Sequence, residues 1–280
     1  MLRRQVEQIG ADAGAADVAV ALYDYGGEAA WSLRGERSFH AASTIKTAVL
    51  LGLFDAVDRD ELPADAVLHV RNRFLSAADG EPFRVVTDRD ANADVHRSIG
   101  RLRPVRDLAY HMITTSSNLA TNLIVDLLGA ERITAALARH GIDGLAVRRG
   151  VEDERAWEAG IINTATASGL VRLYRAIHDE AISASATRAM EEILLAQQFT
   201  SGLPAGLPDA ARVAHKTGEI STVTHDAGLV FLPDRDPYIL AVLTEWDAGS
   251  DASADTRRAA VADVSRAVYE HVTAEEVAHD

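Results

Sequence analysis

Two short stretches hold the only lysines of this chain, and their residue types suit nucleophilic catalysis. Of 28 basic residues two are lysine and the other 26 are arginine; the lysines are Lys46, in Ser43-Thr-Ile-Lys46, and Lys216, in Lys216-Thr217-Gly218. A guanidinium stays protonated, whereas an amine loses its proton when it is desolvated or lies near positive charge. Ser43 and Lys46 are three residues apart, so they share one face of a helix. This spacing suits a serine nucleophile beside a lysine base.

A third stretch, Ser116-Ser117-Asn118, lies at the expected start of a helix. Serine and asparagine also cap helices, so this stretch alone predicts little. The order Ser-x-x-Lys, Ser-x-Asn, Lys-Thr-Gly, on a strand–helix–strand plan, predicts more. It resembles the class A β-lactamases and penicillin-binding proteins. The resemblance covers roughly residues 15–275.

The resemblance implies a catalytic role for four of these residues. Ser43 is expected to be the nucleophile, at the start of a buried helix whose dipole helps to stabilise its alkoxide. Lys46 is expected to take or relay the proton of Ser43. Ser116 and Lys216 are expected to pass a proton to the leaving nitrogen.

The same resemblance implies a substrate-binding set. Lys216 and Thr217 are expected to hold the substrate carboxylate, and Asn118 to hydrogen-bond both the substrate's amide side chain and the amine of the Ser-x-x-Lys motif. Gly218 lets the substrate backbone approach the strand closely. The backbone N–H of Ile220, with that of the nucleophile, is expected to form the oxyanion hole.

This chain departs from the family pattern at two places. The middle motif of the β-lactamases usually has Asp where this chain has Ser117, and we expect only a change in loop packing. In the family, a loop Glu followed a few positions later by Asn activates the water for deacylation; residues 147–167 correspond to that loop, and the Glu-x-x-x-Asn spacing is missing. Glu152 is the best positional match because the family loop places an Arg just before its Glu. The other candidates are Asp153, Glu154 and Glu158.

The expected fold class is α/β, and within it the α+β type. We expect a β-lactamase/transpeptidase-like fold, in which terminal helices flank an antiparallel sheet of N- and C-terminal strands and an all-helical lobe is inserted. We expect one unit over residues 1–280, with a sheet lobe of 1–42 plus 205–280 and a helical lobe of 43–204. Between residues 62 and 104 the pattern predicts loops with short helices. The expected strands are 18–25, 28–35, 211–218, 226–233 and 237–246, and the expected helices are 2–13, 43–57, 104–115, 117–128, 131–140, 166–180, 186–199 and 254–274.

The composition excludes several classes of binding partner and of chemistry. A net charge of −14 argues against nucleic acid and against an anionic membrane surface. No window holds about 18 consecutive apolar residues, so no membrane span is expected. The chain has no cysteine, which excludes thiol chemistry. We expect no cofactor and no metal, because no H-E-x-x-H spacing occurs and the acidic run 88–94 has the pattern of a solvated loop.

The N-terminal residues lack the apolar segment of a signal peptide, so the chain as written is expected in the cytoplasm, or outside it if a leader was removed. No heptad seam suggests more than a monomer. The expected partner is a small molecule, a β-lactam or a D-alanyl peptide.

Three functions are compatible with these residues. The leading hypothesis is a serine hydrolase that opens β-lactam rings through an acyl-enzyme on Ser43. The alternative keeps the nucleophile but acts as a D-alanyl peptidase, an esterase or an amidase, with slow deacylation after β-lactam attack. A third possibility is a β-lactam sensor that is acylated once. The loop carboxylate discriminates among these functions, because a general base that activates the deacylating water accelerates deacylation by about 10²- to 10⁴-fold.

Overall fold

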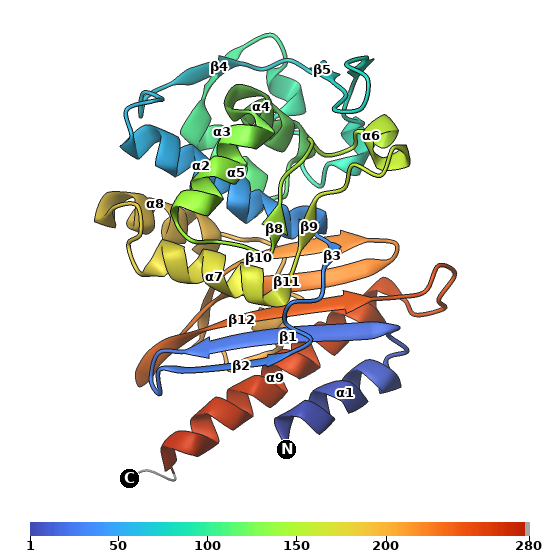
Figure 1. The fold of residues 1–280 in the computed structure, drawn as a ribbon, viewed down its shortest axis with the longest axis vertical. Helices are drawn as coiled ribbons and strands as arrows, with labels where there is room; N and C mark the ends of the chain where they lie inside the picture. Colours follow the sequence, from blue (N-terminus) through green and yellow to red (C-terminus); the bar gives the residue numbers. More distant parts are fainter. Residues whose placement is uncertain (278–280) are drawn as a thin grey trace. The chain divides into compact units, whose positions relative to one another are not determined.

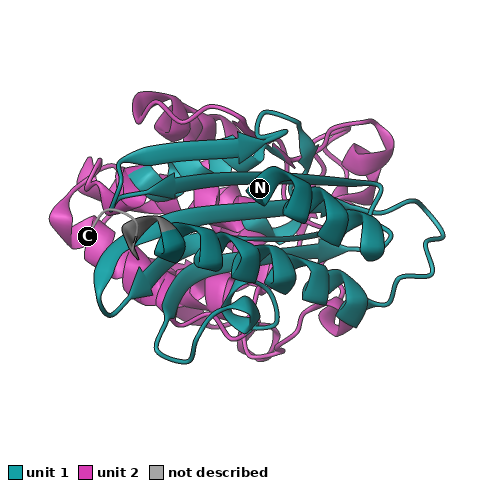
Figure 2. Ribbon diagram, turned by 90° about the horizontal axis from the view of Figure 1, so that it is seen from below, with its two compact units in different colours: residues 1–44, 165–175, 199–280 teal, residues 45–164, 176–198 magenta. Residues whose placement is uncertain are grey.

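A computed structural model describes residues 1–277 and divides the chain into two compact units. Unit 1 contains residues 1–44, 165–175 and 199–280, and unit 2 contains residues 45–164 and 176–198 (Figure 2). Each unit has its own buried side chains and is described in turn.

Unit 1 is built on a five-stranded antiparallel sheet (Figure 1). Its order is β10-β11-β12-β1-β2, so the N-terminal strand β1 pairs with β12 near the C-terminus, from Asp17 opposite Glu245 to Asp24 opposite Tyr238. The pairing of N- and C-terminal strands in one antiparallel sheet confirms the prediction. The strands are β1 (Asp17–Asp24), β2 (Ala29–Leu33), β10 (Arg212–Ile220), β11 (Val223–Leu232) and β12 (Arg235–Glu245).

The terminal helices α1 (Leu2–Asp12) and α9 (Ala254–Val277) lie along this sheet (Figure 1). Alternating residues of the central strands point toward them, as the period of two in a strand requires. One buried cluster joins α1, the sheet and α9; it includes Leu2, Val6, Val20, Leu22, Leu240, Val242, Val261, Val264 and Val268.

Unit 2 is mainly helical, and α2 (Lys46–Asp58) is its most buried helix. Ten of its 13 residues are buried, because apolar side chains occupy almost its whole circumference. The other helices of this unit are α3 (Val105–Thr114), α4 (Asn118–Leu128), α5 (Ala130–Arg139), α6 (Glu154–Glu158) and α8 (Ala184–Leu195). Helix α7 (Ala167–His178) contributes residues to both units.

The prediction of loops and short helices between residues 62 and 104 was incomplete. Two strand pairs also form there: β4 (Val67–His69) with β7 (Leu102–Pro104), and β5 (Phe74–Leu75) with β6 (Pro82–Phe83). Strands of two or three residues are too short for any alternation of side chains to appear in the sequence. The remaining short strands are β3 (Phe39–His40), β8 (Leu145–Ala146) and β9 (Thr164–Ala165).

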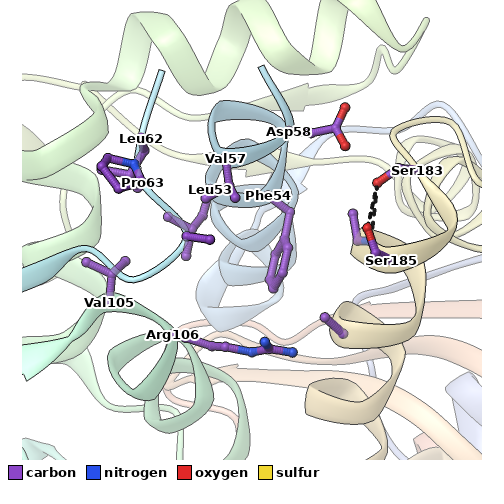
Figure 3. A pocket seen from close by; sticks show the side chains of 13 residues that line it. Leu53, Phe54, Val57, Asp58, Leu62, Pro63, Val105, Arg106, Ser183 and Ser185 are labelled. Atoms are coloured by element: carbon purple, nitrogen blue, oxygen red, sulfur yellow. Dashed lines mark hydrogen bonds between the residues drawn. The ribbon is translucent and has the colours of Figure 1, made fainter. Parts of the chain in front are cut away.

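A pocket of about 240 Å³ opens in unit 2 among α2, α3 and α8 (Figure 3). Its wall is largely apolar, with Leu53 and Phe54 on α2 and the guanidinium of Arg106 from α3. Ser183 and Ser185, which hydrogen-bond to each other over 3.3 Å, form part of its rim. The residues of the three motifs do not line it.

Within residues 1–277 no helix combines the length and the apolar character needed to cross a membrane. The same residues hold no group of three or more His, Asp or Glu side chains placed to bind a metal ion.

Candidate active site

Ser43 lies in a 3-10 turn, Ala42–Ile45, that leads directly into α2. The sequence predicted Ser43 inside the α-helix, whereas the α-helix begins three residues later at Lys46. The turn is held locally: Thr44 Oγ1 donates to the carbonyl oxygen of Ala41 (2.6 Å), and Ala42 N–H donates to Nδ1 of His40 (3.0 Å). Ala42 has a φ of 45°, a left-handed conformation that is unfavourable for a residue with a Cβ.

Gly218 of the Lys-Thr-Gly motif lies against the Ser43 turn within unit 1. A Cβ on Gly218 would stand 3.0 Å from the backbone nitrogen of Ser43 and 2.9 Å from that of Thr44. No side chain fits there, so glycine at this position is a steric requirement of the turn. Gly218, the seventh of the nine residues of β10, is therefore a close neighbour of the Ser43 backbone.

Lys216 and Thr217 precede Gly218 on β10, which is an edge strand of the five-stranded sheet. Lys216 is fully buried, and its Nζ donates to the carbonyl oxygen of Thr217 over 3.0 Å. Ile220 is the last residue of β10 and pairs with Val223 across the turn. An edge strand leaves one row of backbone groups without a strand partner, which suits the binding of an extended ligand.

His225 ties β11 to the segment that precedes Ser43. It pairs with Gly218 in the sheet register, its Nε2 donates to the carbonyl oxygen of His40 (2.9 Å), and its Nδ1 accepts from Thr244 N–H (3.1 Å). Both bonds need a neutral ring with its proton on Nε2. Burial lowers the pKa of His225 to about 4, in agreement with this arrangement. His225 was not among the residues predicted from the sequence.

In unit 2, Lys46 is fully buried and hydrogen-bonds the middle motif. Its Nζ donates to the carbonyl oxygen of Ser116 (2.7 Å) and to Oδ1 of Asn118 (2.8 Å), and lies 3.1 Å from Oγ of Ser116. Burial lowers the pKa of Lys46 to about 7, and the nearby charges of Asp90 and Glu152 oppose that shift. An amine with this pKa is partly neutral at pH 7, so it can accept a proton from a hydroxyl.

Glu152 is the loop carboxylate that reaches this group. Its Oε1 accepts from Nδ2 of Asn118 (2.7 Å), its Oε2 accepts from Val86 N–H (3.0 Å), and its side chain is 9% exposed. Lys46, Asn118 and Glu152 thus form one hydrogen-bonded chain. Glu152 also lines a pocket of about 260 Å³, bordered by residues of 82–89 and 152–155.

The other three candidate carboxylates occupy different surroundings. Asp153 is buried, caps α6 by accepting from Ala156 N–H (3.2 Å), and accepts from Oγ of Ser76 (2.7 Å). Glu154 is exposed and pairs with Arg89 over 3.0 Å. Glu158 is exposed at the end of α6.

Two of the residues in this chain of contacts have unusual backbone conformations. Ser116 has a φ of 55° and Glu152 a φ of 59°, which places them among the seven non-glycine residues with positive φ in the described part of the chain. Such conformations cost of order 1–3 kcal/mol and persist where the surroundings impose them, often at functional sites. Here the surroundings are the hydrogen bonds of both side chains with Lys46 and Asn118.

The prediction that residues 88–94 form a solvated loop was wrong for Asp90. Its side chain is 0% exposed, and its carboxylate accepts from the backbone N–H groups of Asn118 and Leu119. The run is rich in acidic residues, so its pattern resembled a solvated face, and no local feature distinguished the one buried carboxylate from its exposed neighbours.

Two asparagines that were not predicted from the sequence, Asn122 and Asn163, hold the loop before Glu152. Nδ2 of Asn122 donates to the carbonyl oxygen of Val151 (2.9 Å), and Val151 N–H donates to Oδ1 of Asn122 (2.7 Å). Asn163 bonds the backbone at both Arg148 and Arg149. Asn122 follows Asn118 by four residues on the apolar helix α4, and a buried amide on such a face is a signal that could have identified it.

Comparison with known proteins extends over nearly the whole chain. A model of the β-lactamase enzyme family matches residues 1–272. A β-lactamase of Bacteroides uniformis is 24% identical over 269 residues, which cover 87% of this chain and 85% of that protein. A β-lactamase of Streptomyces albus G is 28% identical over 249 residues, which cover 85% and 76%.

Comparison with solved structures finds proteins of the same kind as these sequence relatives. PBP-A is 26% identical, with a TM-score of 0.81 and coverage of 97% of this chain and 96% of PBP-A. A mutant of PBP-A, solved as an acyl-enzyme complex with penicillin G, is 25% identical with a TM-score of 0.80. An ancestral class A β-lactamase is 26% identical, with a TM-score of 0.81 and coverage of 97% and 100%. The predicted class A β-lactamase and penicillin-binding-protein fold is therefore confirmed, and the chain belongs to the β-lactamase enzyme family.

Proposed function

We propose that this protein hydrolyses β-lactams through an acyl-enzyme on Ser43. The observation that carries the proposal is the pair of hydrogen bonds that links Lys46 through Asn118 to Glu152. The bond from Lys46 to Asn118 measures 2.8 Å, and the bond from Asn118 to Glu152 measures 2.7 Å. It provides an amine that can take up a proton and a carboxylate that can activate water. The family membership supports a small-molecule β-lactam as the substrate.

Acylation makes one bond and breaks one. Oγ of Ser43 attacks the lactam carbonyl carbon, its proton passes to Lys46, and the carbon–nitrogen bond of the ring breaks as the nitrogen is protonated through Ser116 and Lys216. The backbone N–H groups of Ser43 and Ile220 are assigned to the developing oxyanion, and Thr217 to the substrate carboxylate. These roles follow the family resemblance, and the partly neutral Lys46 supports the first of them.

Deacylation needs water, and we assign its activation to Glu152. The carboxylate takes a proton from water as the oxygen attacks the ester carbon, and the bond to Ser43 Oγ breaks with return of a proton to the serine. General-base help of this kind is worth about 10²- to 10⁴-fold, or roughly 3–5.5 kcal/mol. Among these three neighbouring carboxylates Glu152 bonds Asn118, whereas Asp153 caps α6 and Glu154 forms a surface ion pair, which supports the choice of Glu152.

A second candidate function is that of a penicillin-binding-protein-like D-alanyl peptidase whose β-lactam adduct persists. Two observations favour it: the similarity to PBP-A, and the engagement of both Glu152 oxygens, one by Asn118 and one by Val86 N–H. A carboxylate that already accepts hydrogen bonds from two donors has fewer lone pairs available to accept one from a water molecule. The two candidates share acylation and differ in the lifetime of the acyl-enzyme.

Intact-protein mass spectrometry with penicillin G, sampled from seconds to hours, tests both. We expect a mass increase on the wild-type protein that appears and then decays while the antibiotic is consumed. An adduct that stays for hours supports the peptidase-like candidate. The absence of any adduct, with the penicillin left intact, contradicts both.

The Ser43→Ala variant is the matched control. It should form no adduct and leave the penicillin intact, because no other residue is assigned as nucleophile. Full turnover by Ser43→Ala would overturn the mechanism, even if the wild-type protein hydrolyses penicillin.

A further inference from the structure

Asp90 contacts the middle motif from a part of the chain 28 residues away. Its oxygens accept from the N–H groups of Asn118 and Leu119, the latter over 3.2 Å, and from Oγ of Ser117 (3.1 Å). All three donors belong to the beginning of α4. A buried carboxylate is tolerated where its oxygens are hydrogen-bonded, and this one is.

Ser117 completes the same cap. Its Oγ accepts from Ala120 N–H over 3.2 Å, and Asp90 accepts from the N–H groups of the two residues that precede Ala120. The first N–H groups of a helix have no partner within the helix, and negative charge is favourable there. The cap therefore fixes the backbone of Asn118 and, with it, the direction of the Asn118 amide toward Lys46.

Asp90 also acts on Lys46 through its charge. The two carboxylates whose charges raise the pKa of Lys46 are Asp90 and Glu152, and burial, which is the larger effect, lowers it. The titratable ring in contact with Asp90 is that of His96, whose Nε2 lies 2.9 Å from Oδ2 of Asp90 and whose Nδ1 lies 3.2 Å from Oγ1 of Thr87.

We infer that Asp90 is a positioning residue for the reaction proposed above: its carboxylate holds Asn118 from outside the motif and supplies part of the negative charge that surrounds Lys46. In the family resemblance, an Asp usually stands between the Ser and Asn of the middle motif, where this chain has Ser117. In this chain the carboxylate at the start of α4 is that of Asp90, which belongs to a different segment of the sequence. Its catalytic consequence rests on the proposed function, but its effect on Lys46 does not.

The two-lysine composition gives a direct test. Lysine labelled with ¹³C at Cε produces two side-chain signals in NMR spectra, from Lys46 and Lys216, and the Lys216→Arg variant assigns them. In Asp90→Asn we expect the Lys46 signal to titrate about half a pH unit or more below its wild-type midpoint, because a neighbouring negative charge is lost. Asp88→Asn, an exposed position in the same acidic run, is the matched control and should titrate like the wild type.

The same variants are then compared in acylation by penicillin G, followed by mass spectrometry over pH 5–9. Asp90→Asn should acylate about 10-fold or more slowly, since Asn118 loses the cap that orients it, and the acidic limb of its rate profile should move to lower pH. A change in overall stability would leave the position of that limb unchanged. Asp88→Asn should match the wild type in both rate and profile.

The outcomes separate the inference from the proposed function. A folded Asp90→Asn with wild-type Lys46 titration and wild-type acylation overturns the inference. If the wild-type protein neither forms an adduct nor consumes penicillin G, the proposed function fails, while the NMR titration still decides whether Asp90 acts on Lys46. If Asp90→Asn does not fold, Asp90→Glu keeps the charge and displaces the oxygens; slower acylation with an unmoved limb is then expected, and wild-type acylation would overturn the positioning role.

Discussion

Lys46 and Glu152 are joined through a single side-chain amide, that of Asn118. Lys46 Nζ donates to its oxygen over 2.8 Å, and its nitrogen donates to Oε1 of Glu152 over 2.7 Å. The amine and the carboxylate each select one end of the amide, so its orientation is determined by chemistry. The groups assigned to acylation and to deacylation are therefore held by one residue of α4.

Replacing Glu152 with Gln should separate the two half-reactions. Gln keeps an acceptor for Asn118 but cannot take a proton from water, so acylation continues while deacylation slows about 10²- to 10⁴-fold. Mass spectrometry should show an adduct of penicillin G that outlives the wild-type one. Glu154→Gln and Glu158→Gln, at exposed positions of the same loop, are the controls and should turn over normally. If Glu154→Gln rather than Glu152→Gln accumulates the adduct, the assignment of the base is wrong.

Acylation should depend on the protonation of Lys46. Its pKa of about 7 makes the amine mostly charged below pH 6 and mostly neutral above pH 8, so the acylation rate should rise with pH across this window and then level off. Lys46→Arg should lose acylation by about 100-fold or more, because a guanidinium does not accept a proton at these pH values. Single-turnover acylation rates from pH 5 to 10 measure both effects. A limb centred near pH 10, the ordinary value for lysine, would contradict the assignment.

Gly218→Ala should disable the Ser43 turn. The added Cβ would stand 2.9–3.0 Å from two backbone nitrogens, so the turn must move, and a displacement of about 1 Å can cost about 100-fold in rate. Gly27→Ala is a matched control, since its Cβ would meet only Ala29 Cβ at 3.8 Å. Acylation rates of the two variants, with circular dichroism to verify folding, provide the measurement. Wild-type acylation by Gly218→Ala would show that the close approach is dispensable.

His225 should make unit 1 sensitive to acid. Its pKa of about 4 lies below the ordinary value near 6.5, so between these values the unfolded chain binds more protons than the folded one. Stability from this group is complete above about pH 6.5 and falls as the pH drops toward 4, by on the order of 3 kcal/mol. Urea unfolding of wild type and His225→Gln at pH 7 and pH 5 should show a wild-type advantage that shrinks at pH 5.

His69→Gln serves as the control for this prediction. His69 is exposed on β4, so its replacement should leave the pH dependence of unfolding like that of the wild type. An advantage of wild type over His225→Gln that is equal at both pH values would mean that His225 is not held neutral by the fold.

Much of this architecture could be predicted from local patterns. The strands of 18–25 and 211–246 and the helices around 104–128 follow from the periodicity of apolar residues, which reports the buried face of each element. The three motifs are local as well, since each spans only three or four residues. The use of lysine at positions 46 and 216, in a chain that otherwise uses arginine, is visible without any fold.

Contacts between distant segments could not be predicted in this way. Glu152, Asp153 and Glu154 are adjacent acidic residues, yet one meets Asn118 across 34 positions of sequence, one caps α6, and one remains at the surface. Asp90 and Asp88 likewise differ in burial and not in type. Periodicity describes how a segment faces its immediate neighbours, whereas the role of a carboxylate depends on which donors the folded chain brings to it. Composition and spacing thus pointed to Ser43 as the proposed nucleophile and to the two lysines, whereas long-range packing decides which acidic groups lie beside Lys46 and Asn118.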